Sequence, residues 1–451
     1  MDALITNGNL VTPWEIITGV TIGIERGKIS CIQRDTISSK AKEVIDARGN
    51  YIFPGIIDCH THFGAFLSYE DDVITETKAA AAGGVTTVFH VILEQGSVFE
   101  RIPYYIETTE RLATVDMSFW AACMTENHLE EISKCYERGF RGFKFFMAYK
   151  GDEMKKVGIS GIDLAYLFRG MENIKEAGGI AVVHAENYEL LQLFRQRYSH
   201  RNDFPAFCRS RPPLCEETDA DTACRMAEEI GVPLYIVHVG AGKVLDIVGE
   251  FRKRGNQVYI ETSPRYLVIN HDGTGIKQPK LALTTPAYKP PESLARLWEG
   301  IKGDEVDCIA TDSSANRGKE KIGDGTLWKM QLSWQEMPTL LPMMVSEGFH
   351  KGRMTLNQLV KLTSYNPAKI FGLYPRKGTL QPGADADLII VDVDKKQNVA
   401  AELFPSACDY TPYEGWELKG WPVLTMVRGE VVMEDGKVRE ASGWGKVVGI
   451  R

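Results

Sequence analysis

The sequence predicts an α/β protein, a TIM-type (β/α)8 barrel that carries a small β-sandwich domain formed from both chain ends. Two observations predict this fold. Strand-like and helix-like segments alternate through the middle of the 451 residues, and short strand-like runs dominate both ends. An open doubly wound sheet is the alternative, although no Gly-x-Gly-x-x-Gly follows the first middle strand. We expect residues 1–52 to begin the small domain, residues 53–375 to form the barrel, and residues 376–451 to complete the small domain with a closing segment.

The two chain ends share one pattern. Apolar and β-branched runs are separated by turn dipeptides such as Asn7-Gly8, Arg26-Gly27 and Asp435-Gly436. The runs cover residues 3–5, 20–24, 28–32, 387–392, 423–427 and 430–433. Because the two ends look alike and flank a long middle region, we expect them to join in one β-domain.

The middle region supplies the barrel. Eight strands are expected at residues 51–58, 85–91, 118–124, 142–148, 179–184, 233–238, 257–262 and 306–310. Helix-like segments fall between them, including residues 162–177, 219–230, 244–254 and 291–302. Eight strands that alternate with helices indicate a parallel sheet, and eight is the number that closes a TIM-type barrel.

Composition excludes several classes of protein. Hydrophobic residues make up 44% and charged residues 25%, as in an ordinary soluble protein, and the formal net charge of -8 disfavours nucleic-acid binding. No run of 18 apolar residues predicts a membrane span, and the first residues lack the pattern of a signal peptide. The 9 cysteines include no Cys-x-x-Cys pair, which predicts free thiols and a cytoplasmic location.

Side chains of metal-ligand type follow the predicted strands. His60 and His62 end the first strand, and because residues two apart on a strand face the same way, both imidazoles can point at one spot. His184, His238 and Asp312 end strands 5, 6 and 8. Barrel enzymes place their active sites at this end of the strands. Four imidazoles and a carboxylate suit zinc or another borderline divalent metal.

Lys144 lies on strand 4 among apolar and aromatic residues. Both desolvation and the neighbouring cationic metal site would disfavour a charged amine there. A snorkelling or ion-paired lysine is one reading. The functional alternative is a lysine whose charge has been removed, by a route that the residues alone do not show.

With these motifs in place, the chain resembles the amidohydrolase superfamily, specifically its dihydropyrimidinase, hydantoinase and allantoinase branch. The resemblance covers nearly the whole chain, and its motifs are specific as a set. They lie at residues 53–62, 142–150, 183–187, 261–267, 377–388 and 410–415.

The resemblance implies two divalent metal ions, zinc or alternatively manganese. His60, His62 and Asp312 would bind the more buried ion, and His184 and His238 the other. Lys144 would be carboxylated by CO₂ and would bridge both ions as N6-carboxylysine, which turns the disfavoured cation into an anion. Lys150 is a competing candidate, but the family's bridging lysine follows a small residue and a Phe, as Lys144 does.

The implied reaction is the opening of a cyclic amide ring in a hydantoin, a dihydropyrimidine or a related ureide or imide. A hydroxide that bridges the two metals would attack the ring carbonyl. Asp312 would accept the proton and pass it to the leaving nitrogen. Tyr149, five residues after the bridging lysine, would stabilise the oxyanion, although a packing role is the alternative. The resemblance also implies a homodimer or homotetramer, and the segment around residues 410–421 is a candidate for docking on a second subunit.

Three departures from the family pattern limit the choice of substrate. The Pro-Asn-Gly that follows strand 8 in dihydropyrimidinases is absent, and Leu332 takes the place of its asparagine. Gln331, Ser333 or Gln335 could compensate. The Ser-Pro-Pro segment becomes Thr285-Pro286-Ala287, and the residue after Asp312 is Ser313.

Beyond the metal ligands and Tyr149, we expect Ser263, Thr285, Phe66 and Leu332 to contact the substrate. Residues 63–69 and the residues after Lys150 are candidate specificity lids, and Phe66, Leu67 and Tyr69 favour a bulky or apolar substituent. His90 could face the site, although a core or supporting role fits it better. No nucleic-acid or membrane partner is expected.

Two alternatives stay open. One is an allantoinase-like ureide hydrolase. The other is a non-enzymatic scaffold that kept the fold, as in relatives that lost their metal ligands, whereas this chain keeps all six candidate ligands.

Overall fold

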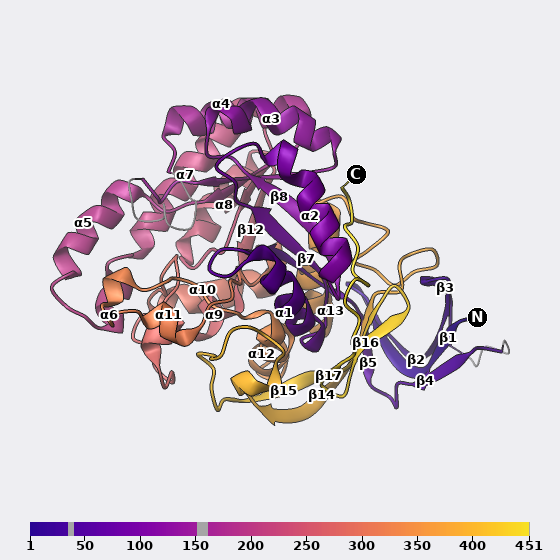
Figure 1. Cartoon of the computed structure of the whole chain (residues 1–451). Helices are drawn as coiled ribbons and strands as arrows, with labels where there is room; N and C mark the ends of the chain where they lie inside the picture. Colours follow the sequence, from indigo (N-terminus) through magenta and orange to yellow (C-terminus); the bar gives the residue numbers. More distant parts are fainter. Residues whose placement is uncertain (35–39, 151–160, 451) are drawn as a thin grey trace.

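A computed structural model describes residues 1–34, 40–150 and 161–450 of the chain, and its centre is a barrel of parallel strands ringed by helices (Figure 1). The strands pair in the order β13-β12-β11-β10-β9-β8-β7-β6. They are β6 (Ile56–Thr61), β7 (Val85–Ile92), β8 (Asp116–Ala122), β9 (Gly142–Phe146), β10 (Ile180–His184), β11 (Leu234–Ile236), β12 (Val258–Thr262) and β13 (Cys308–Ile309). The predicted fold is therefore confirmed.

The barrel closes between its first and last strands. Thr61 forms a parallel bridge with Ser313, and the Ser313 carbonyl accepts a hydrogen bond from the backbone N–H of His62 at 2.8 Å. The buried carboxylate of Asp58 also accepts from the backbone N–H of Thr311 at 3.0 Å. Closure thus brings the segments that carry His62 and Asp312 side by side.

The strand predicted over residues 51–58 is wrong in one respect, because two strands share this segment. β5 (Tyr51–Pro54) belongs to the second sheet, and only β6 enters the barrel. Gly55 stands at the break, and a Cβ there would come within 2.1 Å of the Thr86 hydroxyl on β7. The chain must approach β7 too closely at this point for any larger residue.

The helices around the barrel follow the strands as expected. Asp163 caps α4 (Leu164–Ala177) by accepting from the backbone N–H of Tyr166, and Gly178 ends it with a left-handed φ of 92°. α7 (Pro213–Ile230) starts six residues before the predicted position, because two prolines preset its first turn. The other α-helices are α1 (Tyr69–Ala82), α2 (Val98–Leu112), α3 (Glu126–Glu137), α5 (Tyr188–Tyr198), α6 (Phe204–Arg209), α8 (Lys243–Lys253), α9 (Pro264–Val268), α10 (Pro291–Lys302), α11 (Gly318–Ile322), α12 (Leu340–Met343), α13 (Leu356–Val360) and α14 (Asn366–Ile370).

Alternate strand residues fill the barrel interior. One buried cluster takes side chains from every second position, including Ile57, Cys59, Phe89, Val91, Trp120, Ala122, Tyr235, Val237, Cys308 and Ala310. Phe371, which follows α14, packs into the cluster with its ring centre 4.9 Å from that of Trp120. The barrel is therefore a packed core that supports the residues at its strand ends.

Both chain ends build a second, nine-stranded sheet beside the barrel, where the first and last strands lie together (Figure 1). It contains β1 (Ala3–Val11), β2 (Ile16–Glu25), β3 (Lys28–Gln33), β4 (Glu43–Asp46), β5, β14 (Leu388–Asn398), β15 (Glu417–Val427), β16 (Glu430–Glu434) and β17 (Lys437–Val438). β14 pairs antiparallel with β5 from Leu388↔Pro54 to Val391↔Tyr51. Residues of both ends also share one hydrophobic cluster, which confirms the expected union of the two ends.

The closing segment packs on its own barrel. The Tyr410 hydroxyl donates to Asn316, and the Tyr413 hydroxyl donates to the buried carboxylate of Glu336. Both acceptors lie in the segment that follows Asp312. All nine cysteines are free thiols. Across the described ranges, no helix combines the length and hydropathy needed to cross a membrane.

Candidate metal centre and active site

The predicted ligands meet at the carboxyl ends of the barrel strands. His60 lies on β6 with His62 just beyond it, Lys144 lies on β9, and His184 ends β10. His238 and Asp312 follow β11 and β13. All six are buried except His62, which is partly exposed. The parallel barrel therefore gathers at one site residues that the sequence separates by about 250 positions.

One group of donors consists of His60, His62 and Asp312. One carboxylate oxygen of Asp312 lies 3.1 Å from Nε2 of His62 and 3.5 Å from Nε2 of His60. One ligand atom from each residue lies within 4.8 Å of the others, which is close enough for a single metal ion. Two imidazoles and a carboxylate match the donor types that zinc prefers.

A second group of donors consists of His184 and His238. The rings of His184 and His238 are 4.4 Å apart, and the His238 ring stacks 5.5 Å from that of His60. The amine of Lys144 is fully buried and lies 3.2 Å from Nε2 of His60. Lys144 is therefore a neighbour of the first group and lines the same pocket as His184 and His238.

Two buried glutamates orient the imidazoles. Glu261 accepts a hydrogen bond from Nδ1 of His60 at 2.9 Å, and it also accepts from the backbone N–H of His238 at 3.0 Å. Glu186 lies 3.0 Å from Nε2 of His184. A hydrogen bond to one ring nitrogen fixes the tautomer and leaves the other nitrogen available to a metal. The geometry thus assigns Nε2 of His60 and Nδ1 of His184 as the free nitrogens.

The protonation states suit metal binding. Burial and the nearby Lys144 amine hold the pKa of His60 well below its ordinary value, and burial with the neighbouring His184 does the same to the pKa of His238. Burial also lowers the pKa of Lys144 to about 7. Both imidazoles are therefore neutral, which is the form that binds a metal.

Two of these residues have strained backbones. His238 has a φ of 42° and Asp312 a φ of 52°, in the left-handed region that residues other than glycine seldom adopt. His238 comes two residues after the end of β11, and Asp312 comes three residues after the end of β13. The turn of the chain at each residue directs its side chain toward the site. Strain of this kind costs about 1–3 kcal/mol per residue and is concentrated at functional sites.

A pocket of about 490 Å³ opens over the two groups of donors. Tyr149 and Thr285 line it, and their hydroxyl oxygens are 3.1 Å apart. The Thr285 hydroxyl donates to Glu186 at 3.0 Å and therefore receives the hydrogen bond from Tyr149. Phe66 and Leu332 also line the pocket, so four of the five predicted substrate contacts lie on its wall.

Ser263 is the exception. It is fully buried at the start of α9, its hydroxyl has no hydrogen-bond partner among the described residues, and it is not part of the pocket wall. Of the three candidates to replace the missing asparagine, Ser333 lines the pocket and donates to the Asp312 carbonyl at 2.8 Å. Gln331 lines a neighbouring pocket, whereas Gln335 is bound to Glu76 on α1.

The remaining candidates take supporting positions. His90 packs between Phe63 and Tyr69, and its Nδ1 accepts from the backbone N–H of Phe63 at 3.1 Å, so it anchors the loop over residues 63–69. Lys150 forms a partly exposed ion pair with Glu189 at 3.0 Å. The second expected lid, after Lys150, falls on residues 151–160, which lie outside the described residues.

Sequence reasoning missed Arg211, Glu186 and Glu261 as parts of the site. Arg211 donates to both Glu186 and Thr285 at 3.1 Å. Glu186 and Glu261 both belong to motifs of the sequence. Glu186 stands two residues after the strand-end histidine His184, and Glu261 stands at the end of the predicted strand over residues 257–262, and these positions could have indicated a role in the site. Arg211 carried no signal, because it lies in the turn between α6 and α7, far in the sequence from the strand ends, and only folding brings it to the site.

The arrangement has the parts of a metal-assisted hydrolase. The residues fit two metal ions for two reasons. Imidazoles and the carboxylate of Asp312 lie close together, and these are donor types that zinc prefers. In addition, Nδ1 of His62 and of His238 lack partners among the described residues. A buried carboxylate, Asp312, is available for proton transfer, and a buried phenol, Tyr149, is available to donate a hydrogen bond.

Known proteins resemble the chain along its whole length. The sequence profile described as "Amidohydrolase family" matches residues 51–432. A D-hydantoinase of Geobacillus stearothermophilus is 35% identical over 99% of this chain and 96% of its own, and an L-hydantoinase of Paenarthrobacter aurescens is 32% identical over 99% and 98%. Among solved structures, an L-hydantoinase (dihydropyrimidinase) from Arthrobacter aurescens gives a TM-score of 0.92 at 30% identity, with all of both chains covered. A dihydropyrimidinase from Brevibacillus agri gives a TM-score of 0.92 at 28% identity, and the match covers 100% of this chain and 99% of that one.

Proposed function

Because this chain belongs to the amidohydrolase family, we propose that it is a metal-dependent hydrolase that opens a cyclic amide ring in a hydantoin, a dihydropyrimidine or a related ureide or imide. The names of its relatives, D-hydantoinase and L-hydantoinase, support this substrate class. The observation that carries the proposal is that five of the six donor residues line one pocket that also holds Tyr149, while the sixth, His60, lies within metal-binding distance of His62 and Asp312.

The proposal assigns the donors to two divalent ions, zinc or manganese. His60, His62 and Asp312 would hold one ion, and His184 with His238 would hold the other. Lys144, as N6-carboxylysine, would bridge them. Its complete burial beside His60 supports this role, because a cation there would be desolvated next to two metals, whereas a carbamate would neutralise them.

When bound, the two metals would lower the pKa of water enough to supply hydroxide near neutral pH. Asp312 would accept a proton as the ring carbonyl is attacked and would deliver that proton to the leaving ring nitrogen. Tyr149 donates a hydrogen bond to the carbonyl oxygen as negative charge develops there. Thr285 accepts from Tyr149 in the resting site and keeps the phenol aimed into the pocket.

The apolar part of the pocket wall favours a hydantoin or dihydropyrimidine over allantoin. Phe66, Leu93 and Leu332 line it, and none of them can satisfy the polar ureido group of allantoin. Retention of all six donors disfavours the scaffold alternative. A homodimer or homotetramer and a cytoplasmic location stay predictions from the sequence.

The test is a ring-opening assay of protein loaded with zinc or manganese in the presence of bicarbonate. The panel contains dihydrouracil, 5-substituted hydantoins, allantoin, dihydroorotate and simple cyclic imides. We expect hydantoins or dihydrouracil to open, and we expect the Asp312→Asn variant to lose about 10²–10⁴-fold in rate because its proton acceptor is gone. A protein that binds two metals yet opens no ring would refute the substrate class, and one that binds no metal would refute the enzyme.

A further inference from the structure

Arg265 is a fully buried arginine that the proposed function does not yet use. It lies in the first turn of α9, four residues after Glu261, and it is not part of the wall of the catalytic pocket. A buried charge is tolerated only where hydrogen bonds and an opposite charge satisfy it. The groups that accept from Arg265 therefore indicate what this arginine does.

Each of the three guanidinium nitrogens donates to a different segment of the chain. Nε donates to the carboxylate of Glu336 at 2.8 Å, Nη1 to the hydroxyl of Thr284 at 3.0 Å, and Nη2 to the carbonyl oxygen of Thr311 at 2.6 Å. The central carbon of the guanidinium also lies 4.7 Å from the centre of the Trp334 ring. The planar fork of an arginine can reach all these acceptors at once, whereas the single ammonium of a lysine could not.

The bond to Thr311 bears directly on Asp312, which is the next residue. The backbone of Asp312 is strained, with a φ of 52°, and such a conformation persists only where the surrounding contacts impose it. Arg265 holds the carbonyl group before Asp312, and the Ser333 hydroxyl donates to the carbonyl of Asp312 itself at 2.8 Å. Side-chain donors therefore fix the peptide groups on both sides of the Asp312 Cα, and with them the direction of its carboxylate.

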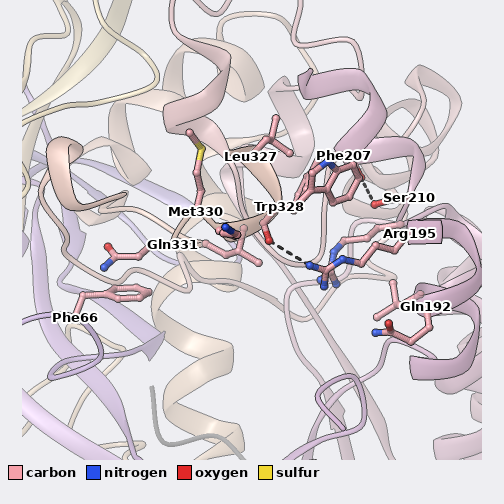
Figure 2. Close-up of a pocket in the computed structure, with 13 residues that line it drawn as sticks. Phe66, Gln192, Arg195, Phe207, Ser210, Leu327, Trp328, Met330 and Gln331 are labelled. Atoms are coloured by element: carbon pink, nitrogen blue, oxygen red, sulfur yellow. Dashed lines mark hydrogen bonds between the residues drawn. The ribbon is translucent and has the colours of Figure 1, made fainter. Parts of the chain in front are cut away.

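The segment after Asp312 supplies the counter-ion of Arg265. Figure 2 shows that Met330, in this segment, lines an outer pocket beside the catalytic one. Further along, Glu336 is fully buried, and its backbone N–H donates to the hydroxyl of Ser313 at 2.9 Å. Glu336 thus holds the residue after Asp312 directly, and it holds the residue before Asp312 through Arg265.

An arginine that only balanced a buried charge would need no acceptor besides Glu336. The bonds of Arg265 to Thr284 and Thr311 instead tie the guanidinium to two loops that carry the next residues, Thr285 and Asp312. Both Thr285 and Asp312 line the catalytic pocket. Arg265 therefore connects two walls of that pocket from behind them.

We propose that Arg265 is a positioning residue for the reaction. With Glu336 as its counter-ion, it fixes the peptide group before Asp312 and so holds the Asp312 carboxylate in place for the metal ion and for proton transfer. The part of Asp312 in proton transfer rests on the proposed function, whereas its place beside His60 and His62 needs only the metal site.

A double variant separates positioning from charge balance. Arg265→Met removes the ion-pair partner of buried Glu336, so we expect it to lower the midpoint of urea unfolding. Arg265→Met/Glu336→Gln removes both charges and should recover most of that loss. The double variant still lacks the donor to Thr311, so kcat for a hydantoin should stay about 10–100-fold below the wild type, with a smaller change in KM.

Zinc affinity gives a readout that does not depend on turnover. Because Asp312 is a candidate ligand, its displacement should weaken the binding of one of the two zinc ions by about 10–100-fold, the usual effect of losing a contact that orients a metal ligand. Competition with a chromophoric chelator measures this affinity in the wild type and in the double variant.

Arg252→Met is the matched control. Arg252 also pairs with a carboxylate, that of Asp307, and it donates to the carbonyls of Val258 and Glu305. These acceptors lie at or before the amino ends of β12 and β13, at the opposite end of the strands from the site. The control variant should lose stability and keep the kcat and the zinc affinity of the wild type.

The double variant decides between the two roles. If kcat and zinc affinity both stay low although stability has been recovered, the positioning role stands. If both return to wild-type values together with stability, Arg265 only balances the charge of Glu336 and the proposal is wrong. If the wild type binds zinc but opens no ring, the ring-opening function is wrong, and the zinc affinities alone decide the role of Arg265.

Discussion

Tyr149 remains a phenol across the working pH range, because burial and the carboxylate of Glu186 raise the pKa of its hydroxyl above the ordinary value. A phenol can donate a hydrogen bond, whereas a phenolate could not. Tyr149 lies three residues beyond β9 (Gly142–Phe146), the strand that carries Lys144, so this strand and the turn after it position the proposed bridging residue and the proposed oxyanion donor together.

We expect Tyr149→Phe to lower kcat by about 10²–10³-fold, the usual result of removing one donor from an oxyanion site. KM should change little if the donor acts mainly on the transition state. Steady-state kinetics with a hydantoin that the wild type opens would measure both values.

The structural control for this change is thermal unfolding. The variant loses one hydrogen bond, to Thr285 at 3.1 Å, and keeps the ring. The cost to stability should therefore be about 1 kcal/mol. A rate that is unchanged in Tyr149→Phe would leave the tyrosine only the packing role.

The sequence could predict that the six candidate donors lie together, because strand ends in a parallel barrel meet at one face and all of them except Lys144, in the middle of β9, stand at or just after such an end. It could not predict which nitrogen of each imidazole is free. That depends on Glu186 and Glu261, whose contacts with His184 and His60 are set by neighbouring turns and strands. Nor could the sequence predict that Ser263, although it belongs to the family motif at residues 261–267, is not part of the pocket wall.

At the scale of elements, the segment that follows β13 determines the shape of the pocket. Ser333 has a φ of 84°, and it stands where the family's Pro-Asn-Gly has its glycine. This value lies in the left-handed region, which residues other than glycine seldom adopt. The sequence alone predicted a lost contact at Leu332, but not the left-handed backbone at Ser333.

Lys321 anchors this loop through hydrogen bonds. Its fully buried amine donates to the carbonyls of Leu283, Gln331 and Ser333 at 3.0, 2.9 and 2.6 Å. Leu283 is two residues from Thr285, so one lysine ties together the two loops that carry Thr285 and Ser333, which both line the catalytic pocket. Loss of the amine would leave buried carbonyl oxygens without a donor.

We expect Lys321→Met to lower the free energy of unfolding by about 1–3 kcal/mol, the cost of unsatisfied buried acceptors. It should also raise KM, because Ser333 and Thr285 would no longer be fixed. Urea denaturation and steady-state kinetics measure the two effects. Lys319→Met is the control, since Lys319 is exposed on the same short helix; equal behaviour of the two variants would contradict the role of Lys321.

At the scale of the whole molecule, Lys377 joins the barrel to the sheet of the chain ends. Its buried amine lies 2.7 Å from Asp116, at the start of β8, and 3.3 Å from Asp385, and it also pairs with Asp387. The three carboxylates lie close enough to resemble a cation site, but the Lys377 ammonium already pairs with all three, and Lys28, Arg376 and Arg428 supply further positive charge. The segment that contains Lys377, Asp385 and Asp387 was a family motif in the sequence, whereas the partner Asp116 was not predictable.

We expect Lys377→Met to lower the free energy of unfolding by about 3–5 kcal/mol at pH 7, because it removes a buried cation that contacts all three carboxylates and leaves Asp387 without an ion-pair partner among the described residues. Lys28→Met should cost less than about 1 kcal/mol, since Lys28 contacts Asp385 from a half-exposed position. Chemical denaturation of both variants tests the difference. Equal losses would show that the buried cluster contributes no more than a surface pair.

The pH dependence supplies a second test. Burial opposes ionisation of Asp385, but Lys377, Lys28 and Arg376 hold the pKa of Asp385 below its ordinary value. The stability that this carboxylate contributes is therefore present above about pH 4 and is lost as the pH falls below it. In Lys377→Met, burial without the lysine favours the protonated acid, so the gap between variant and wild type should shrink on going from pH 7 to pH 4. A constant gap would contradict this account.

The pairing of β5 with β14 also has a consequence for biosynthesis. Pro54 and Leu388 are partners, although more than 330 residues separate them along the chain. At a translation rate of about 5–20 residues per second, the N-terminal strands wait roughly 20–70 seconds for the segment that completes their sheet. During that time β5 offers an unpaired edge to any other extended chain. The nascent protein therefore depends on the ribosome's pace, or on a chaperone that covers this edge, to reach its folded state before it associates with a neighbour.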